Sequence, residues 1–284
     1  MREKRTGLAP RASIRCWLPA LALAGFVAAA ALPRPYYVQT AGFARNAAPL
    51  IQVGAAMEGR EAEAAAAATG PAWLYTAVKL ERASLLEAAY AELMGRGDAL
   101  SVRSVLGGAS EEAYRIRMEE AMRQALLLAA RAAADEAKRE VVEAEGEAGT
   151  SEREAEKAGS QPSGLRLADG GREPLWLGAA AAGGPSAGLM AALSLYDRLT
   201  PDAELLGGRR IAGTGTIDAA GRIGAVGGVA RKAQAAAEAG AGLFVAPKAE
   251  AGEAEKAARR AGGRMRVVGA DTLAEAVALL QPRP

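Results

Sequence analysis

The feature that most restricts the fold of this chain is an alternation of strand-like and helix-like segments over residues 165–284. Five apolar or β-branched runs are typical of strands, at 165–167, 175–178, 210–218, 243–246 and 265–268. Segments that favour helices stand between or after them, at 186–199, from about 229, at 250–261 and at 272–280. A sequence in which strands alternate with helices predicts an α/β (α+β) domain.

The residues before this domain predict a smaller mixed α/β domain over residues 33–142. Residues 36–54 and 73–80 are typical of strands, and residues 84–94 favour a short helix. Ser110 is expected to cap a long helix, because two glutamates follow it in the first turn, where the helix dipole favours acids. One face of that helix carries a stripe that is typical of a packed core: Met118, Met122, Ala125, Leu126 and Ala129. The polar stretch 143–164 is predicted to be a linker.

The N-terminal residues have the pattern of a membrane-targeting segment. Residues 1–15 hold five basic side chains, and residues 16–32, "CWLPALALAGFVAAAAL", hold no charge. Positive charge before an apolar run favours an N-terminus in the cytoplasm and a remainder beyond the membrane. A transmembrane signal anchor over 16–32 is favoured over a cleaved signal peptide, for which the alanine run offers sites, and over a buried helix of a soluble protein.

Composition excludes several kinds of chemistry. The chain has 35 basic and 33 acidic side chains without a long block of one sign, so nucleic acid is not an expected partner. A single cysteine, Cys16, excludes an internal disulfide framework and cysteine-rich metal sites. The absence of histidine excludes serine or cysteine catalysis through an imidazole and removes the usual zinc ligand. Proton transfer near neutral pH would need a carboxylate, a lysine or a tyrosine.

A glycine-rich turn runs into a helix at "GGPSAGL", residues 183–189, with Ser186 at the point of entry. Three interpretations are open for this serine: a helix N-cap, part of an anion-binding cradle at the helix N-terminus, or a nucleophile. No phosphate-binding P-loop string occurs in the sequence. "GTGTIDAAG", residues 213–221, matches a dinucleotide fingerprint poorly.

A nucleophilic serine needs a base, and a lysine can act as one when burial lowers its pKa. Lys232 lies in the alanine- and glycine-rich stretch 224–247. At helical spacing it shares one face with Val229, Ala233 and Ala236. Periodicity alone would also allow an ordinary solvated lysine at this position.

Taken together, these segments resemble the proteolytic domain of Lon-type serine/lysine proteases. "GGPSAGL" resembles the nucleophile segment of that family, and "AGTGTIDAAGRIGAVGGVARKAQAAAEAGAGLFVAPKAE", residues 212–250, resembles its catalytic-lysine segment. The order and spacing of the two segments also fit. More narrowly, "LPRPYYVQTAGFARNAAPLIQV" and "GASEEAYRIRMEEAMRQAL" are similar to parts of bacterial membrane-anchored Lon-like proteases that have no ATPase.

The resemblance implies an ATP-independent serine endopeptidase without metal or cofactor. Ser186 would be the nucleophile, Lys232 the base, and Thr214 a supporting residue close to the lysine. The backbone N–H groups of Gly184, Ser186 and Ala187 would form the oxyanion hole. The expected partners are protein or peptide substrates, the membrane through the N-terminal helix, and other copies of the chain, since the family often forms hexamers. The PDZ domain that such proteins usually carry is missing here, because only 143–164 lies in its place.

Two alternatives from other classes remain. A catalytically inactive membrane scaffold could keep the Lon-like fold for self-association, and a binding module could hold a small anion at the helix N-terminus. The predicted order is therefore a cytoplasmic segment (1–15), an anchor (16–32), an N-terminal extracytoplasmic domain (33–142), a linker (143–164) and a Lon-like proteolytic domain (165–284).

Overall fold

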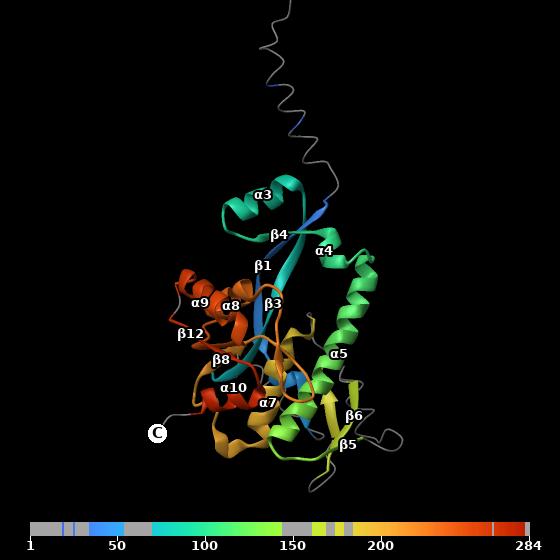
Figure 1. Cartoon of the computed structure of the whole chain (residues 1–284), viewed down its shortest axis with the longest axis vertical. Helices are drawn as coiled ribbons and strands as arrows, with labels where there is room; N and C mark the ends of the chain where they lie inside the picture. Colours follow the sequence, from blue (N-terminus) through green and yellow to red (C-terminus); the bar gives the residue numbers. More distant parts are fainter. Residues whose placement is uncertain are drawn as a thin grey trace, which may run out of the picture. The chain divides into compact units, whose positions relative to one another are not determined.

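The computed structural model of the chain describes residues 34–53, 70–143, 161–168, 174–178, 184–262 and 264–281, with isolated positions 19 and 25 (Figure 1). It divides into two compact units. The smaller unit comprises Met1–Val38 and Leu80–Gly107, and the larger unit comprises Gln39–Lys79 and Gly108–Pro284. Strands β1 (Tyr36–Asn46) and β3 (Ala72–Ala83) have residues in both units.

The larger unit is built on a sheet in which the strand order is β12-β11-β8-β3-β1. Strands β8 (Arg210–Gly213), β11 (Leu243–Pro247) and β12 (Arg266–Ala270) follow one another in the C-terminal part of the chain. β11 pairs in parallel with both β8 and β12, and β3 pairs in parallel with the other edge of β8. The chain therefore has the mixed α/β architecture that the alternation predicts.

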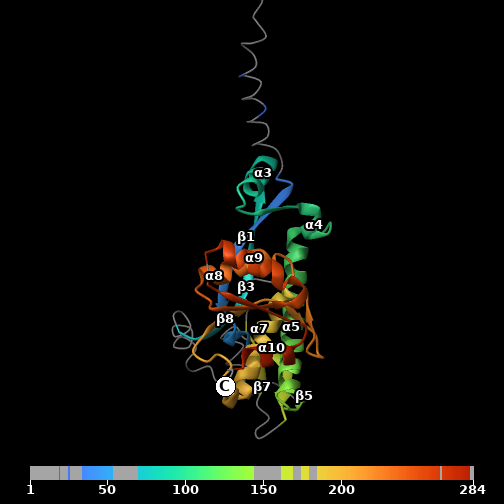
Figure 2. The same ribbon diagram turned by 60° about the vertical axis from the view of Figure 1, so that its left-hand side comes forward.

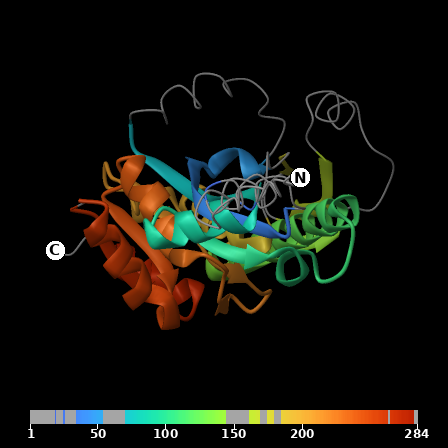
Figure 3. The ribbon, with the colours of Figure 1, turned by 90° about the horizontal axis from the view of Figure 1, so that it is seen from above.

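Alternate residues of these strands enter two separate cores. Leu243 and Val245 of β11 lie in a core with helices α5 (Glu111–Glu136), α7 (Gly188–Leu199) and α10 (Leu273–Leu280). Phe244 and Ala246 lie in a second core with α8 (Val229–Glu238) and α9 (Ala251–Arg260). Successive side chains of a strand point to opposite faces, so a helix layer covers each face of the sheet. Figures 1 and 3 show α8 and α9, orange to red, on the side away from the green α5.

A second, antiparallel sheet has the order β2-β7-β6-β5. Its strands are β2 (Ile51–Val53), β5 (Val141–Glu143), β6 (Gln161–Leu167) and β7 (Pro174–Leu177). In its register Ile51 faces Leu177, and Val141 faces Leu167. Short elements complete the larger unit: the 3-10 turns η1 (Ala48–Leu50), η2 (Pro185–Ala187), η3 (Pro201–Ala203) and η4 (Lys248–Glu250), and the hairpin of β9 (Thr216–Ile217) with β10 (Ile223–Gly224).

The long helix α5 confirms most of the predicted core stripe. Its N-cap is Ser110, whose hydroxyl accepts a hydrogen bond from the N–H of Ala113. Four of the five stripe residues are buried, and Met118 is half-buried. Alanines dominate the buried face, and small side chains let the helix lie close to α7 and η2.

The smaller unit contains α3 (Leu85–Leu93), β4 (Asp98–Ser101) and α4 (Val102–Leu106), with the first residues of β1 and the last residues of β3. Ser84 and Glu87 form a capping box at the start of α3. The carbonyl of Arg34 accepts a hydrogen bond from Arg82 Nη1 at 3.0 Å, and that of Pro35 accepts one from the N–H of Val102 at 2.9 Å.

The structure departs from the predicted elements in two places near Ser186. The predicted strand 210–218 is broken into β8 and β9. The N–H of Thr214 still donates to the carbonyl of Val245 in β11, but the N–H of Gly215 donates to the carbonyl of Ser186, outside the sheet. The predicted helix 186–199 begins later, as α7 at Gly188, because Pro185 starts the 3-10 turn η2.

The predicted division of the chain at 143–164 stays a prediction. The compact units of the structure follow another line, because β1 and β3 belong to the same sheet as β8. The predicted anchor 16–32 lies outside the described residues apart from positions 19 and 25. Among the helices that the structure does describe, none is long and apolar enough to cross a membrane.

Candidate active site

Ser186 lies in the middle of η2, between Gly184 and the first turn of α7. The N-cap of α7 is Ala187, and it makes no side-chain cap hydrogen bond. The serine hydroxyl is not used as a helix cap. It accepts instead a hydrogen bond from Lys232 Nζ, at an Nζ–Oγ distance of 2.9 Å. The structure therefore brings together the predicted nucleophile and the predicted base.

Lys232 is held by the first turn of α8. Gly228 precedes the helix with φ of +67°, a left-handed conformation that favours glycine, and its carbonyl accepts the N–H of Lys232 at 3.0 Å. A Cβ at Gly228 would also lie within 3.0 Å of Gln39 and Val78. The lysine is buried, with 4 % of the residue exposed, on the helix face that it shares with buried Val229, Ala233 and Ala236. The predicted apolar setting of this lysine is thus present.

Thr214 links the two residues. It is fully buried, and its Oγ1 lies 3.3 Å from Lys232 Nζ, which donates to it. The same hydroxyl donates to the Ser186 carbonyl at 3.2 Å. The N–H of Gly215 also donates to that carbonyl, at 2.9 Å, and the Gly215 carbonyl accepts from the N–H of Leu189. The break between β8 and β9 therefore holds the serine segment by its backbone and the lysine by its amine.

Burial lowers the pKa of Lys232 from 10.5 to about 8. The cause is the loss of hydration of the ammonium, and the negative charge of Glu250 partly opposes this lowering of the pKa. At pH 7 roughly a tenth of such amines are neutral, whereas at the ordinary pKa the neutral fraction is below about one in a thousand. A neutral amine within hydrogen-bond reach of a hydroxyl can accept its proton.

Glu250 is the member of the site that the sequence reasoning missed. It ends η4, which follows β11, and its Oε2 accepts the N–H of Val226 at 3.0 Å, in the loop before α8. The sequence interpretation placed it at the start of a predicted helix. The one local signal was its position after the predicted strand 243–246. That β8 and β11 are neighbouring parallel strands, which brings Thr214 and Glu250 to the same edge of the sheet, is known only from the structure.

The remaining predicted site residues, Gly184 and Ala187, lie close to Ser186 in the chain. Gly184 is extended and lies beside the half-buried Met118 of α5, whose Sδ would be 3.3 Å from a Cβ at that position. Ala187 is buried next to Ser186. The N–H groups of Gly184, Ser186 and Ala187 precede α7, where the helix dipole is positive. Their role as an oxyanion hole stays a prediction.

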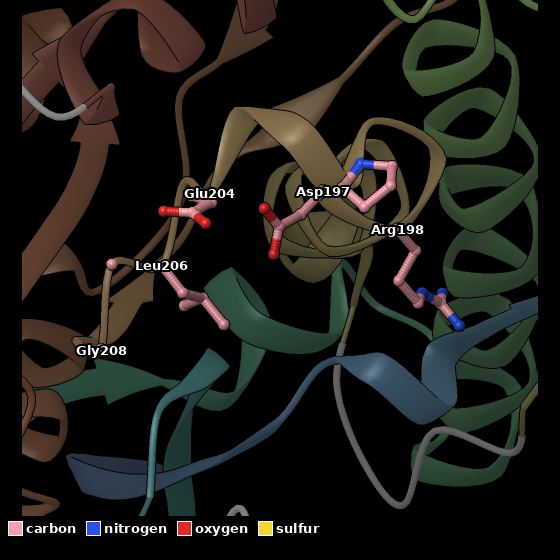
Figure 4. A pocket seen from close by; sticks show the side chains of 7 residues that line it. Asp197, Arg198, Glu204, Leu206 and Gly208 are labelled. Atoms are coloured by element: carbon pink, nitrogen blue, oxygen red, sulfur yellow. The ribbon is translucent and has the colours of Figure 1, made fainter.

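A separate surface depression of about 650 Å³ lies at the other end of α7 (Figure 4). Its lining includes Asp197, Arg198 and Glu204. Asp197 accepts hydrogen bonds from Trp73 Nε1 and the N–H of Leu205, and Arg198 donates to the carbonyl of Ile51. These side chains tie α7 to its neighbours, and Ser186 does not line the depression. Across the described ranges, no group of three or more His, Cys, Asp or Glu could hold a metal ion.

The region that contains this site matches a known protein family. Residues 175–281 match the family model of the Lon protease (S16) C-terminal proteolytic domain. The match runs from β7 to α10 and includes Ser186, Thr214, Lys232 and Glu250. No curated protein matches the chain. Residues 175–281 are thus similar to a Lon-type proteolytic domain, and this similarity points to a serine peptidase that acts on proteins.

Proposed function

We propose that the chain is a membrane-anchored, ATP-independent serine endopeptidase that hydrolyses peptide bonds with a Ser186–Lys232 dyad. The observation that carries the proposal is the 2.9 Å contact between Lys232 Nζ and Ser186 Oγ inside the family-matched region. A buried lysine beside a serine on a glycine-rich turn has no need of histidine, which the chain lacks.

The first half-reaction follows from these positions. Neutral Lys232 takes the proton of the Ser186 hydroxyl as Oγ attacks the substrate carbonyl, and a tetrahedral oxyanion forms. Backbone N–H groups at the start of α7 hold that oxygen, and each such donor is typically worth about 3 kcal/mol of transition-state stabilisation. The protonated lysine then gives its proton to the leaving amine, and an acyl-enzyme remains.

The second half-reaction reverses these roles. Lys232, neutral again, takes a proton from a water molecule that attacks the ester, and returns it to Ser186 Oγ as the peptide acid leaves. Thr214 keeps Nζ directed at the serine through the hydrogen bond at 3.3 Å. Nucleotide has no part in these steps, and the sequence holds no P-loop string.

The proposed location rests on the sequence pattern of the first 32 residues. Five basic residues before seventeen uncharged ones favour a signal anchor with the catalytic domain outside the cytoplasm. Resistance of the full chain to alkaline extraction from membranes, together with cleavage by protease added from the extracytoplasmic side, would test this location independently of activity.

The peptidase assignment is tested with an unfolded protein substrate. Ser186→Ala and Lys232→Ala should each abolish cleavage, while Lys256→Ala, at an exposed lysine of α9, should keep it. A serine-directed fluorophosphonate should label the wild type and fail to label Ser186→Ala. Full cleavage by either dyad variant would contradict the mechanism, and an unlabelled, inactive wild type would favour the alternative of a membrane scaffold.

A further inference from the structure

Helix α3 of the smaller unit exposes its large apolar side chains and buries only small ones. Its buried residues are the small Ala88 and Ala91. Five large apolar residues at or just after this helix are exposed, by 40 to 80 %: Leu85, Leu86, Tyr90, Leu93 and Met94. A helix turns by about 100° per residue. Leu86, Tyr90 and Leu93 therefore form one stripe opposite the buried alanines.

This stripe, called here the α3 stripe (Leu86, Tyr90 and Leu93), contains no polar residue of the helix itself, and the guanidinium of Arg96, after the helix, lies 5.8 Å from the centre of the Tyr90 ring. The acidic residues of the helix, Glu87 and Glu92, lie on its flanks and are exposed. Glu87 accepts the N–H of Ser84 in the capping box, and Glu92 accepts the N–H of Ala99 at 3.4 Å. A contiguous apolar surface of this kind marks an interaction site.

The start of the described chain is fastened to the same unit. Arg34 and Pro35 are bound through their carbonyls by Arg82 and Val102, and Arg82 is two residues before the N-cap of α3. Figures 1 and 2 show α3 beside the first residues of β1. The predicted anchor ends at Leu32, and two residues can span at most about 7 Å. If residues 16–32 span a bilayer, the chain therefore leaves the membrane next to the unit that carries the α3 stripe.

We propose that α3 lies in the interface of the membrane that holds the anchor, with the α3 stripe in the boundary between headgroups and acyl chains. This inference rests on the proposed membrane location. An interfacial helix buries its apolar face about 5–10 Å into that boundary, and tyrosine is favoured at this depth. The helix is too short to be an anchor by itself, so its effect is to fix the orientation of the smaller unit on the bilayer.

The test uses the full chain in vesicles of phosphatidylethanolamine and phosphatidylglycerol. In a Cys16→Ser background, an environment-sensitive fluorophore is attached at Leu93→Cys or, as a matched exposed control on α9, at Lys256→Cys. Lipids brominated near the headgroup should quench the probe at 93 and leave the probe at 256 unquenched. Aqueous iodide should give the opposite pattern.

A second variant keeps the experiment decisive. Leu86→Glu changes an exposed residue, so the fold and the cleavage of substrate by the dyad should be retained. In this variant the probe at 93 should lose its lipid quenching, while the chain stays resistant to alkaline extraction. Unchanged lipid quenching would show that the stripe does not direct the helix.

Three outcomes overturn the proposal. One is an extraction-resistant chain in which iodide quenches both probes equally. Another is a probe at 93 that lipid does not quench while two copies crosslink through Leu93→Cys, which would assign the stripe to a second copy of the chain. The third is a chain that alkaline extraction removes from the membrane, which also refutes the proposed location but leaves the peptidase assays to decide the dyad.

Discussion

Two lysines of the C-terminal region have opposite surroundings. Lys232 is buried on α8, and burial lowers its pKa to about 8. Lys248 is exposed on η4, where contacts with Glu275 at 3.0 Å and Asp271 at 3.3 Å raise its pKa. The surroundings of Lys232 favour the neutral amine, and those of Lys248 favour the charged ammonium. Because both residues are lysines, the difference between their pKa values comes from their burial and from the charged groups beside them.

This difference predicts that a Lys→Arg substitution lowers activity at position 232 but not at position 248. A guanidinium stays protonated and cannot act as a base. Lys232→Arg should therefore lower kcat/KM for a fluorogenic peptide by about 1,000-fold or more. Lys248→Arg keeps a cation beside two carboxylates and should leave the rate within about twofold. Comparable losses in both variants would show that the two lysines do not differ in this way.

The orientation of the buried lysine can be weakened without removing it. Thr214→Val deletes the hydroxyl that contacts Lys232 Nζ and the Ser186 carbonyl. We expect kcat to fall about 10- to 100-fold, as one buried hydrogen bond is worth about 1–3 kcal/mol, while KM changes little. Thr214→Ser should restore most of the rate. A loss that appears mainly in KM would contradict a positioning role for this threonine.

Burying Lys232 should also lower the stability of the fold. Its pKa is lower in the folded than in the unfolded chain, so the unfolded chain binds more protons between about pH 8 and 10.5. Stability should rise with pH across that window. Lys232→Met should stabilise the protein at pH 7 by roughly 1–3 kcal/mol in urea unfolding, and should remove the pH-dependent gain.

A smaller effect is expected at Glu250. Its negative charge opposes the lowering of the Lys232 pKa, and its carboxylate holds the N–H of Val226. The wild-type kcat should rise with pH, with a midpoint near pH 8, and reach a plateau as the lysine becomes fully neutral. Glu250→Gln keeps a hydrogen-bond acceptor and removes the charge, so the midpoint should move to lower pH. Glu250→Ala should also lower the plateau value of kcat. An unchanged midpoint in Glu250→Gln would show that the charge of Glu250 does not affect the pKa of Lys232.

Sequence reasoning located the local features of the site and missed those that depend on distant pairing. Ser186 and Lys232 stand in recognisable glycine- and alanine-rich segments, and the Ser110 cap has a local signal. Nothing local indicates that β3 pairs with β8, since their paired residues are more than a hundred positions apart. The contacts of Thr214 and the place of Glu250 likewise depend on β8 lying beside β11, and so they became visible only with the fold.

The pairing of β8 on both sides has a consequence for the design of shorter fragments of this chain. β8 lies between β11 and β3, and Thr76 of β3 also donates a hydrogen bond to the carbonyl of Gly213, the residue before Thr214. A fragment cut at residues 175 and 281 would contain both dyad residues but lack β3. Its β8 would become a bare edge strand, open to pairing with other molecules. A fragment that keeps β8 paired on both sides must therefore begin before residue 72, well ahead of the segment that matches the family model.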